Sequence, residues 1–173
     1  MRMMIVAAAA VGMAAAAGAE ELANPGGGPA LPATKLREIM PKLDAGRAES
    51  FQKPLADAMK EFGINTPKRR AAFLAQVAQE SHELKHFEEL VSSVNGYAPG
   101  NTNPHDTTTF RARGPLMMAG KANYKAAGQA LKLDLEHNPD LVLKTEVGFR
   151  VAAWYWKTMG LNELADHGDI RGI

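Results

Sequence analysis

The sequence predicts a mainly α-helical domain, and three observations support this fold class. Apolar residues recur at helical spacing in several segments, whereas the alternation typical of strands is weak throughout. Gly and Pro stand near the ends of these segments, where helices begin and end. Charged residues make up 23% of the 173 residues, and Lys+Arg (20) nearly equals Asp+Glu (19), as in an ordinary globular domain. The length suits a single domain with a hydrophobic core.

The composition also excludes several classes of function. A formal net charge of +1 without a basic cluster predicts no nucleic-acid partner. Because Cys is absent, disulfides, thiolate metal sites and a cysteine nucleophile are excluded. The five His show no metal-ligand spacing, so they are expected to be solvated surface residues, and neither a metal nor another cofactor is expected.

The N-terminal segment has the pattern of a signal peptide. Arg2 precedes an apolar run over residues 3–17, and Ala17-Gly18-Ala19 fits a small-x-small cleavage site. The run is too short and too rich in Ala to span a bilayer well, so no stable membrane insertion is expected. We therefore expect residues 1–19 to be removed on export to the periplasm or the medium.

The segment that follows predicts a linker and then a first pair of helices. Residues 20–33 are rich in Gly and Pro and are expected to form a flexible linker, so the folded domain should occupy residues 34–173. Thr34 is a candidate N-cap for a short helix through Leu43, which Pro41 should end or kink. A second helix is expected over residues 49–62, with Gly63 placed to stop it.

Thr66 and Pro67 form an N-cap followed by proline at the first helical position, which predicts a helix from Pro67 to about Leu84. Residues 92–109 are rich in Ser, Asn, Gly, Pro and Thr, and we interpret them as a long functional loop. Further helices are expected over residues 121–131 and 145–159.

The helix from Pro67 carries a carboxylate on its apolar face. At 100° per residue, Glu80 lies within about 60° of Phe73, Val77 and Leu84. Burial there would raise the carboxyl pKa, as a general acid near neutral pH requires. The simpler interpretation of the pattern alone is a Glu at a helix end whose carboxylate reaches water.

A second carboxylate for glycoside-type chemistry is available at Glu88 or Glu89. Glu89 follows Glu80 by nine residues, so the two would point to opposite sides of one continuous helix. They could face the same site only if the chain turns between them.

Several segments in order along the chain resemble the family 19 glycoside hydrolases, the chitinase and phage-endolysin group. These segments are residues 62–67 (FGINTP), 71–76 (AAFLAQ), 80–81 (ES), 100–104 (GNTNP), 113–124, 134–141 and 152–162. The resemblance covers about residues 35–173. It implies a lysozyme-like, two-lobed helical domain with a central substrate cleft.

The resemblance also implies a reaction and a set of site residues. Members hydrolyse β-1,4 bonds between N-acetylhexosamines and invert the configuration of the anomeric carbon. The general acid stands at the position of Glu80 and, in the phage branch, the general base stands at that of Glu89. Arg113 of the central motif, with Asn123 and Tyr124 of the Asn-Tyr pair, is expected in the substrate-binding site. Inversion requires room for a water, so the two carboxyl groups should lie roughly 6.5–9.5 Å apart. The implied partner of this expected monomer is peptidoglycan or chitin, and the phage-type loop favours peptidoglycan.

The sequence departs from the family pattern near the chemistry. Met117 and Ala119 stand where relatives carry Gln and a Thr or Ser whose hydroxyl helps to hold the attacking water. His82 and Glu83 replace glycines after the acid, which makes a turn back toward it harder. Relatives also continue past the position of Ile173, which leaves open a C-terminal truncation.

Two functions therefore compete. In the first, the chain is a cell-wall glycosidase, slowed by the changes at Met117 and Ala119. In the second, it is a weakened relative that binds amino-sugar polymer or another protein without cleaving glycan. An unrelated helical structural protein is the third and least supported alternative, because several family motifs occur in order.

Overall fold

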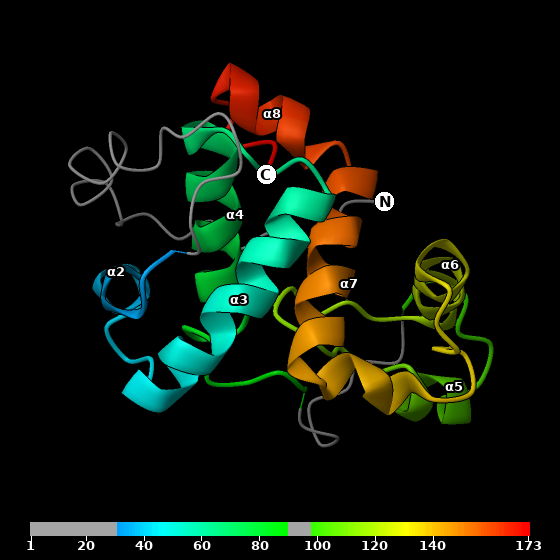
Figure 1. Cartoon of the computed structure of the whole chain (residues 1–173). Coiled ribbons are helices and arrows are strands. Elements are labelled where there is room, and N and C mark those ends of the chain that lie inside the picture. Colours follow the sequence, from blue (N-terminus) through cyan, green and yellow to red (C-terminus); the bar gives the residue numbers. More distant parts are fainter. Residues whose placement is uncertain (1–30, 90–97) are drawn as a thin grey trace.

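The computed structural model describes residues 31–89 and 98–173, and helices dominate both parts (Figure 1). The helices are α2 (Ala33–Ile39), α3 (Ala45–Glu61), α4 (Pro67–Glu80), α5 (Pro104–Thr109), α6 (Lys121–Leu131), the 3-10 helix η2 (Pro139–Leu143), α7 (Thr145–Thr158) and α8 (Leu161–His167). Within these ranges, β-structure is limited to the isolated bridges Glu88–Arg113 and Arg113–Met118. The predicted mainly α class is confirmed.

Helix α7 is central and packs against α3, α6, α8 and η2 (Figure 1). Its apolar face buries Phe149 and Trp156 completely. Phe149 makes an edge contact with Phe51 of α3 at 5.3 Å between ring centroids, and Trp156 makes one with Phe73 of α4 at 5.4 Å. Edge-to-face aromatic pairs stabilise a fold beyond the burial of the rings themselves. These two pairs join α3, α4 and α7 in one core.

The start of the domain differs in detail from the prediction. Thr34 is not an N-cap, because α2 begins at Ala33 with Pro32 in the cap position. Leu31 is already buried in the core, so ordered packing begins within the segment expected to be a linker. Helix α2 ends before Pro41, as expected. Helix α3 begins four residues earlier than predicted, because the Asp44 side chain caps it by accepting from the Arg47 N–H at 3.0 Å.

Helix α4 begins as predicted and ends earlier. The Thr66 hydroxyl accepts from the Arg69 N–H at 3.2 Å, ahead of Pro67 in the first turn. The helix stops at Glu80, because the next residue, Ser81, donates to the Val77 carbonyl at 2.6 Å and accepts from the Leu84 N–H at 2.8 Å. These bonds replace the helical pattern and close a turn, so the predicted extension to Leu84 was wrong.

In the second half of the domain both predicted helices are present, together with η2 and α8, which were not predicted. Helix α6 has the predicted bounds, and α7 ends one residue before the predicted end. The predicted loop 92–109 contains α5, whose N-cap Asn103 accepts from the Asp106 N–H at 2.9 Å. The expected signal peptide and most of the linker lie outside the described residues. No helix in the described ranges is long and apolar enough to cross a membrane.

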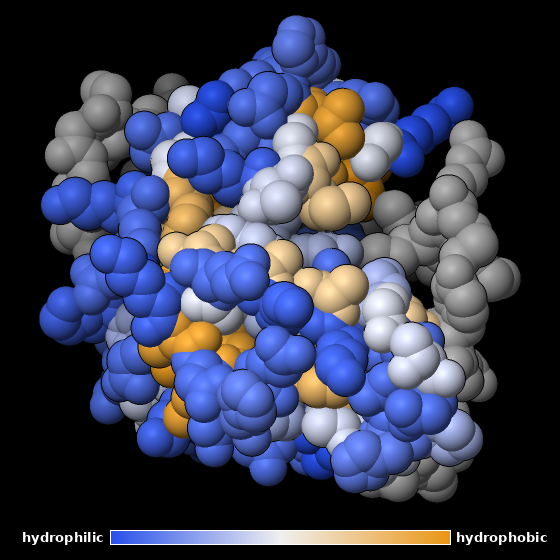
Figure 2. Space-filling model, turned by 90° about the vertical axis from the view of Figure 1, so that its right-hand side faces the viewer, coloured by the Kyte–Doolittle hydropathy of each residue, from blue (hydrophilic) through white to orange (hydrophobic). Residues whose placement is uncertain are grey.

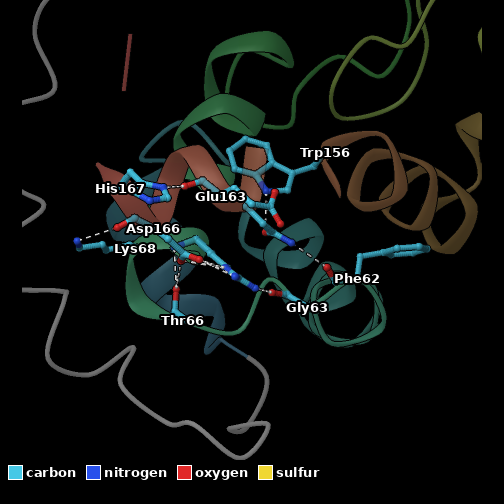
Figure 3. A network of polar contacts seen from close by, with 10 residues as sticks. Phe62, Gly63, Thr66, Lys68, Trp156, Glu163, Asp166 and His167 are labelled. Carbon is cyan, nitrogen blue, oxygen red and sulfur yellow. Dashed lines mark hydrogen bonds and ion pairs between the residues drawn. The ribbon is translucent and has the colours of Figure 1, made fainter. Parts of the chain in front are cut away.

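The N-terminus of α4 is fixed to α8 by an ion pair (Figure 3). Nε and Nη2 of Arg69 donate to the Asp166 carboxylate at 2.9 and 2.5 Å, and Nη1 donates to the Gly63 carbonyl at 2.8 Å. The hydrogen bonds and charge of this guanidinium lower the pKa of Asp166. The N-terminal end of α4 is therefore held against α8.

A buried amide joins three further segments (Figure 3). Asn162 at the start of α8 is 3% exposed. Its Oδ1 accepts from Nε1 of Trp156 at 3.0 Å, and its Nδ2 donates to the carbonyl of Phe62 at 3.1 Å. Because both ends of the amide are satisfied, its burial carries no unpaired polar group, and α7, α8 and the end of α3 are held in one arrangement.

Hydrophilic residues cover most of the face in Figure 2, and hydrophobic residues appear there in small separate groups. Over the described residues, the exposed large hydrophobic side chains are Ile39, Met159 and Ile170. The face in Figure 2 therefore carries no extended apolar surface of the kind that marks a large interface.

Candidate active site

Glu80 is the last residue of α4, and its side chain is half-buried. Nε2 of Gln76, one turn earlier, donates to Oε1 of Glu80 at 3.2 Å. Gln76 therefore fixes one carboxyl oxygen, and the arrangement suits a carboxyl group with a defined orientation. Gln76 was not among the predicted site residues, although its spacing of four residues from Glu80 is a helical contact distance.

The surroundings of Glu80 favour its protonated form. Burial raises the pKa of Glu80, and the positive charge of a protonated His82 opposes this effect. The carboxyl also lies at the C-terminus of a helix, where the macrodipole disfavours a negative charge. Burial, and then the charge of Glu80, raise the pKa of Tyr155 on α7, which places this aromatic side chain in the field of the carboxylate. The raised pKa expected from the apolar stripe is confirmed.

The turn after Glu80 forms without glycine. His82, Glu83 and Leu84 adopt left-handed φ angles of 51°, 61° and 61°. Each such residue costs about 1–2 kcal/mol relative to a right-handed conformation. Tertiary contacts offset this strain: the Glu83 carboxylate accepts from the backbone N–H of Lys42 at 2.6 Å, and Leu84 is completely buried. The reversal that the missing glycines made harder is therefore achieved at a conformational cost.

Beyond this turn the chain pairs with the central motif. The Gly114 N–H donates to the Phe87 carbonyl at 2.8 Å, and the Glu89 N–H donates to the Ala112 carbonyl at 2.9 Å. On the side away from residues 87–89, Arg113 exchanges two backbone hydrogen bonds with Met118, at 3.1 and 2.9 Å. Residues 112–114 thus lie between the segment that carries Glu89 and the segment 117–119. We call this arrangement the three-segment ladder.

Arg113 anchors the ladder from inside the protein. Its side chain is 2% exposed and pairs with Glu88 through Nε at 3.1 Å and with Asp140 through Nη2 at 2.8 Å. Nη1 donates to the Thr109 carbonyl at 2.8 Å and to the Tyr124 hydroxyl at 3.1 Å. A guanidinium presents its donors in a rigid fork, which suits this number of fixed partners.

Tyr124 is also completely buried, and its hydroxyl donates to the Arg111 carbonyl at 2.8 Å. Asn123 is half-buried, and its Nδ2 donates to the Ala119 carbonyl at 2.8 Å. Because the side chains of Arg113 and Tyr124 are buried, they can influence the surface only through the segments that they hold. The substrate-binding role predicted for Arg113, Asn123 and Tyr124 stays a prediction.

The structure thus brings Glu89, Arg113, Asn123 and Tyr124 together around the ladder, and it places Glu80 on α4 facing Tyr155. The separation expected between the carboxyl groups of Glu80 and Glu89 stays a prediction. In the described part of the chain, no group of three His, Cys, Asp or Glu side chains could hold a metal ion. All five His side chains are exposed, as expected.

The fold agrees with the comparison to known families. Residues 62–172 match the family described as chitinase class I, glycoside hydrolase family 19, and the chain belongs to this family. The helical, lysozyme-like fold expected from the motifs is confirmed by solved structures. A bacterial family 19 chitinase has a TM-score of 0.66 at 28% identity, with 80% of this chain and 76% of that chain covered.

Curated relatives are plant chitinases. Chitinase 8 of Oryza sativa subsp. japonica is 42% identical over 71 residues, which cover 40% of this chain and 27% of the relative. An endochitinase of Avena sativa is 32% identical over 112 residues, which cover 62% of this chain and 52% of the relative. The chain therefore spans about a quarter to a half of the length of these relatives.

Proposed function

We propose that this protein hydrolyses β-1,4 bonds between N-acetylhexosamine units, with chitin-type glycan as the substrate favoured by its named relatives and peptidoglycan as the alternative. The observation that carries the proposal is Glu80, a half-buried carboxyl with a raised pKa at the family's acid position. A carboxyl group whose pKa is raised by burial suits the role of a general acid that protonates a glycosidic oxygen.

The proposed reaction proceeds with inversion. Glu80 transfers its proton to the glycosidic oxygen as the bond from the anomeric carbon to that oxygen breaks. A water attacks the anomeric carbon from the opposite side and gives a proton to the carboxylate of Glu89. The product gains the hydroxyl from water, and the two carboxyl groups regain their starting states by exchanging protons with solvent.

The buried residues of the ladder support this reaction indirectly. We assign Arg113 and Tyr124 as positioning residues, because both side chains are buried and hold the segment that pairs with Glu89. Asn123 is half-buried and is the member of the predicted set able to reach substrate directly. Export to the periplasm or the medium, action as a monomer and the absence of nucleic-acid and membrane partners belong to the same proposal.

The test compares Glu80→Gln with wild type on chitin oligomers and, in parallel, on purified peptidoglycan by turbidity. Loss of a general acid should lower kcat about 10²–10⁴-fold while glycan binding and folding persist. Glu49→Gln, at an exposed position of α3, removes the same charge from a residue outside the proposed site and should keep full activity. If Glu80→Gln retains most of the activity, Glu80 is not the acid.

A binding protein without hydrolysis is the second candidate, and Ala119 is the observation that favours it. Its side chain offers no hydrogen bond to a water, and Met117 beside it is apolar. This candidate would be supported if the wild-type protein, with Glu80 and Glu89 intact, binds glycan but forms no hydrolysis product. Turnover by the wild-type chain would exclude it.

A further inference from the structure

We propose that Glu88 is a positioning residue that orients the neighbouring Glu89, an inference that rests on the proposed glycosidase function. Glu88 carries no assigned role, and its carboxylate lies between two arginines. Oε1 accepts from Nε of Arg113 at 3.1 Å and from Nη2 of Arg111. Arg113 lies in the central segment of the ladder and Arg111 directly precedes that segment, so both partners lie outside the segment that carries Glu88.

The two arginines are themselves fixed, so they provide a rigid support. Arg113 is buried and is held by Asp140 and by the carbonyl of Thr109 in addition to Glu88. Nη1 of Arg111 donates to the carbonyl of Thr108 at 2.9 Å. A carboxylate bound by two guanidinium groups forms charge-assisted hydrogen bonds, which are stronger and geometrically more specific than neutral ones.

Because the backbone is extended, fixing the Glu88 side chain also fixes the direction of the Glu89 side chain. Successive side chains of a strand point to opposite faces. Glu88 forms an antiparallel bridge with Arg113, and its side chain is drawn to the face where both arginine side chains lie. The side chain of Glu89 therefore points to the other face, while its N–H is held by the Ala112 carbonyl at 2.9 Å.

Without the Glu88 carboxylate, two backbone hydrogen bonds hold the segment 87–89 to residues 112–114. The segment follows directly on the left-handed turn at His82, Glu83 and Leu84, whose residues are strained. We therefore expect the position of the Glu89 carboxylate to be less well defined in the absence of Glu88. An inverting base must hold one water in line with the anomeric carbon, so its orientation affects turnover more than substrate binding.

The experiment measures kcat and KM on a chitin oligomer for Glu88→Ala and Glu88→Gln, each alone and combined with Glu89→Gln. Misplacement of a catalytic group by about 1 Å can cost about 100-fold, so Glu88→Ala should lower kcat about 10- to 100-fold with KM within about twofold. Glu88→Gln keeps an oxygen acceptor for the arginines and should recover part of the loss. When Glu89 is already Gln, changing Glu88 should lower the residual rate no further, because Glu88 acts only through Glu89.

Glu61→Gln is the matched control. Glu61 pairs with Arg150 and its side chain is 42% exposed, comparable with the 35% of Glu88, and the substitution also removes one negative charge from an ion pair. This variant should keep the wild-type kcat.

The outcomes separate the two proposals. If wild type does not hydrolyse glycan, the proposed function fails. If wild type is active and both Glu88 variants match Glu61→Gln, the positioning role is refuted. The positioning role is also refuted if a Glu88 variant lowers kcat further when Glu89 is already Gln. Such an additive loss would mean that Glu88 acts independently of the base. If Glu88→Ala does not fold, Glu88→Gln decides by the same criteria.

Discussion

Two buried arginines in this protein have opposite surroundings, and the same substitution should therefore have opposite effects. Arg113 is 2% exposed and is paired with Glu88 and Asp140. Arg70 on α4 is 9% exposed, and its Nε is buried without a hydrogen-bond partner among residues 31–89 and 98–173. Burial lowers the pKa of Arg70, which reflects the cost of a desolvated charge.

Replacement by Met keeps an unbranched apolar chain and removes the guanidinium. Arg113→Met should destabilise the fold by about 2–4 kcal/mol, because the Thr109 carbonyl and the Tyr124 hydroxyl each lose a hydrogen bond from a charged donor, while the exposed Asp140 carboxylate returns to water. Arg70→Met should stabilise it by about 1–3 kcal/mol, because a buried unsatisfied donor is removed. The difference in sign follows from the partners alone, since both arginines are buried and both become Met.

Urea unfolding followed by tryptophan fluorescence measures both effects, since Trp154 and Trp156 lie on the central helix α7. Arg150→Met is the control: Arg150 pairs with Glu61 at a partly exposed site, and the loss should be at most about 1 kcal/mol. A destabilised Arg70→Met, or an Arg113→Met as stable as Arg150→Met, would refute the reasoning from hydrogen-bond partners. Midpoints are comparable only if the denaturant slope is unchanged among the variants.

Three further predictions concern the site. Ala119→Thr, alone or with Met117→Gln, should raise kcat with little change in KM, because a hydroxyl would help to hold the attacking water; steady-state kinetics on chitin oligomers test this, and unchanged turnover would contradict it. The folded chain holds the proton of Glu80 more tightly than the unfolded chain, so the contribution of Glu80 to stability is largest at low pH and falls as pH rises from about 4.3, the ordinary value, through the raised pKa. In urea unfolding, Glu80→Gln should accordingly be more stable than wild type at pH 7 and equal to it at pH 3. The fall of kcat/KM at alkaline pH should be absent from this variant, because the general acid that titrates there has been removed. His82→Gly should raise the thermal midpoint, because relief of a left-handed residue, about 1–2 kcal/mol, exceeds the extra flexibility of Gly in the unfolded chain, about 0.5–1 kcal/mol; a lower midpoint would argue against strain at this turn.

Local chemistry in the sequence was sufficient to predict most of the helices. The cap at Thr66 with Pro67 and the bounds of α6 depend on hydrogen bonds and backbone preferences within a few residues. The raised pKa of Glu80 was predictable for the same reason, because helical periodicity alone places its carboxyl beside Phe73 and Val77. The order of the family motifs then predicted the lysozyme-like fold.

The tertiary structure decided which residues face the site and which are buried. Helix α4 ends at Glu80 and not at Leu84, because Ser81 closes a turn whose strained residues are held by contacts such as that of Glu83 with Lys42, 41 residues away. Residue spacing alone left Glu88 and Glu89 open for the second carboxylate, and the family resemblance implied Glu89. The pairing of Glu88 with the buried Arg113, 25 residues away, is a contact that no sequence pattern indicated. Contacts between residues far apart in the chain have no periodic or capping pattern, so their geometry follows only from the packed fold.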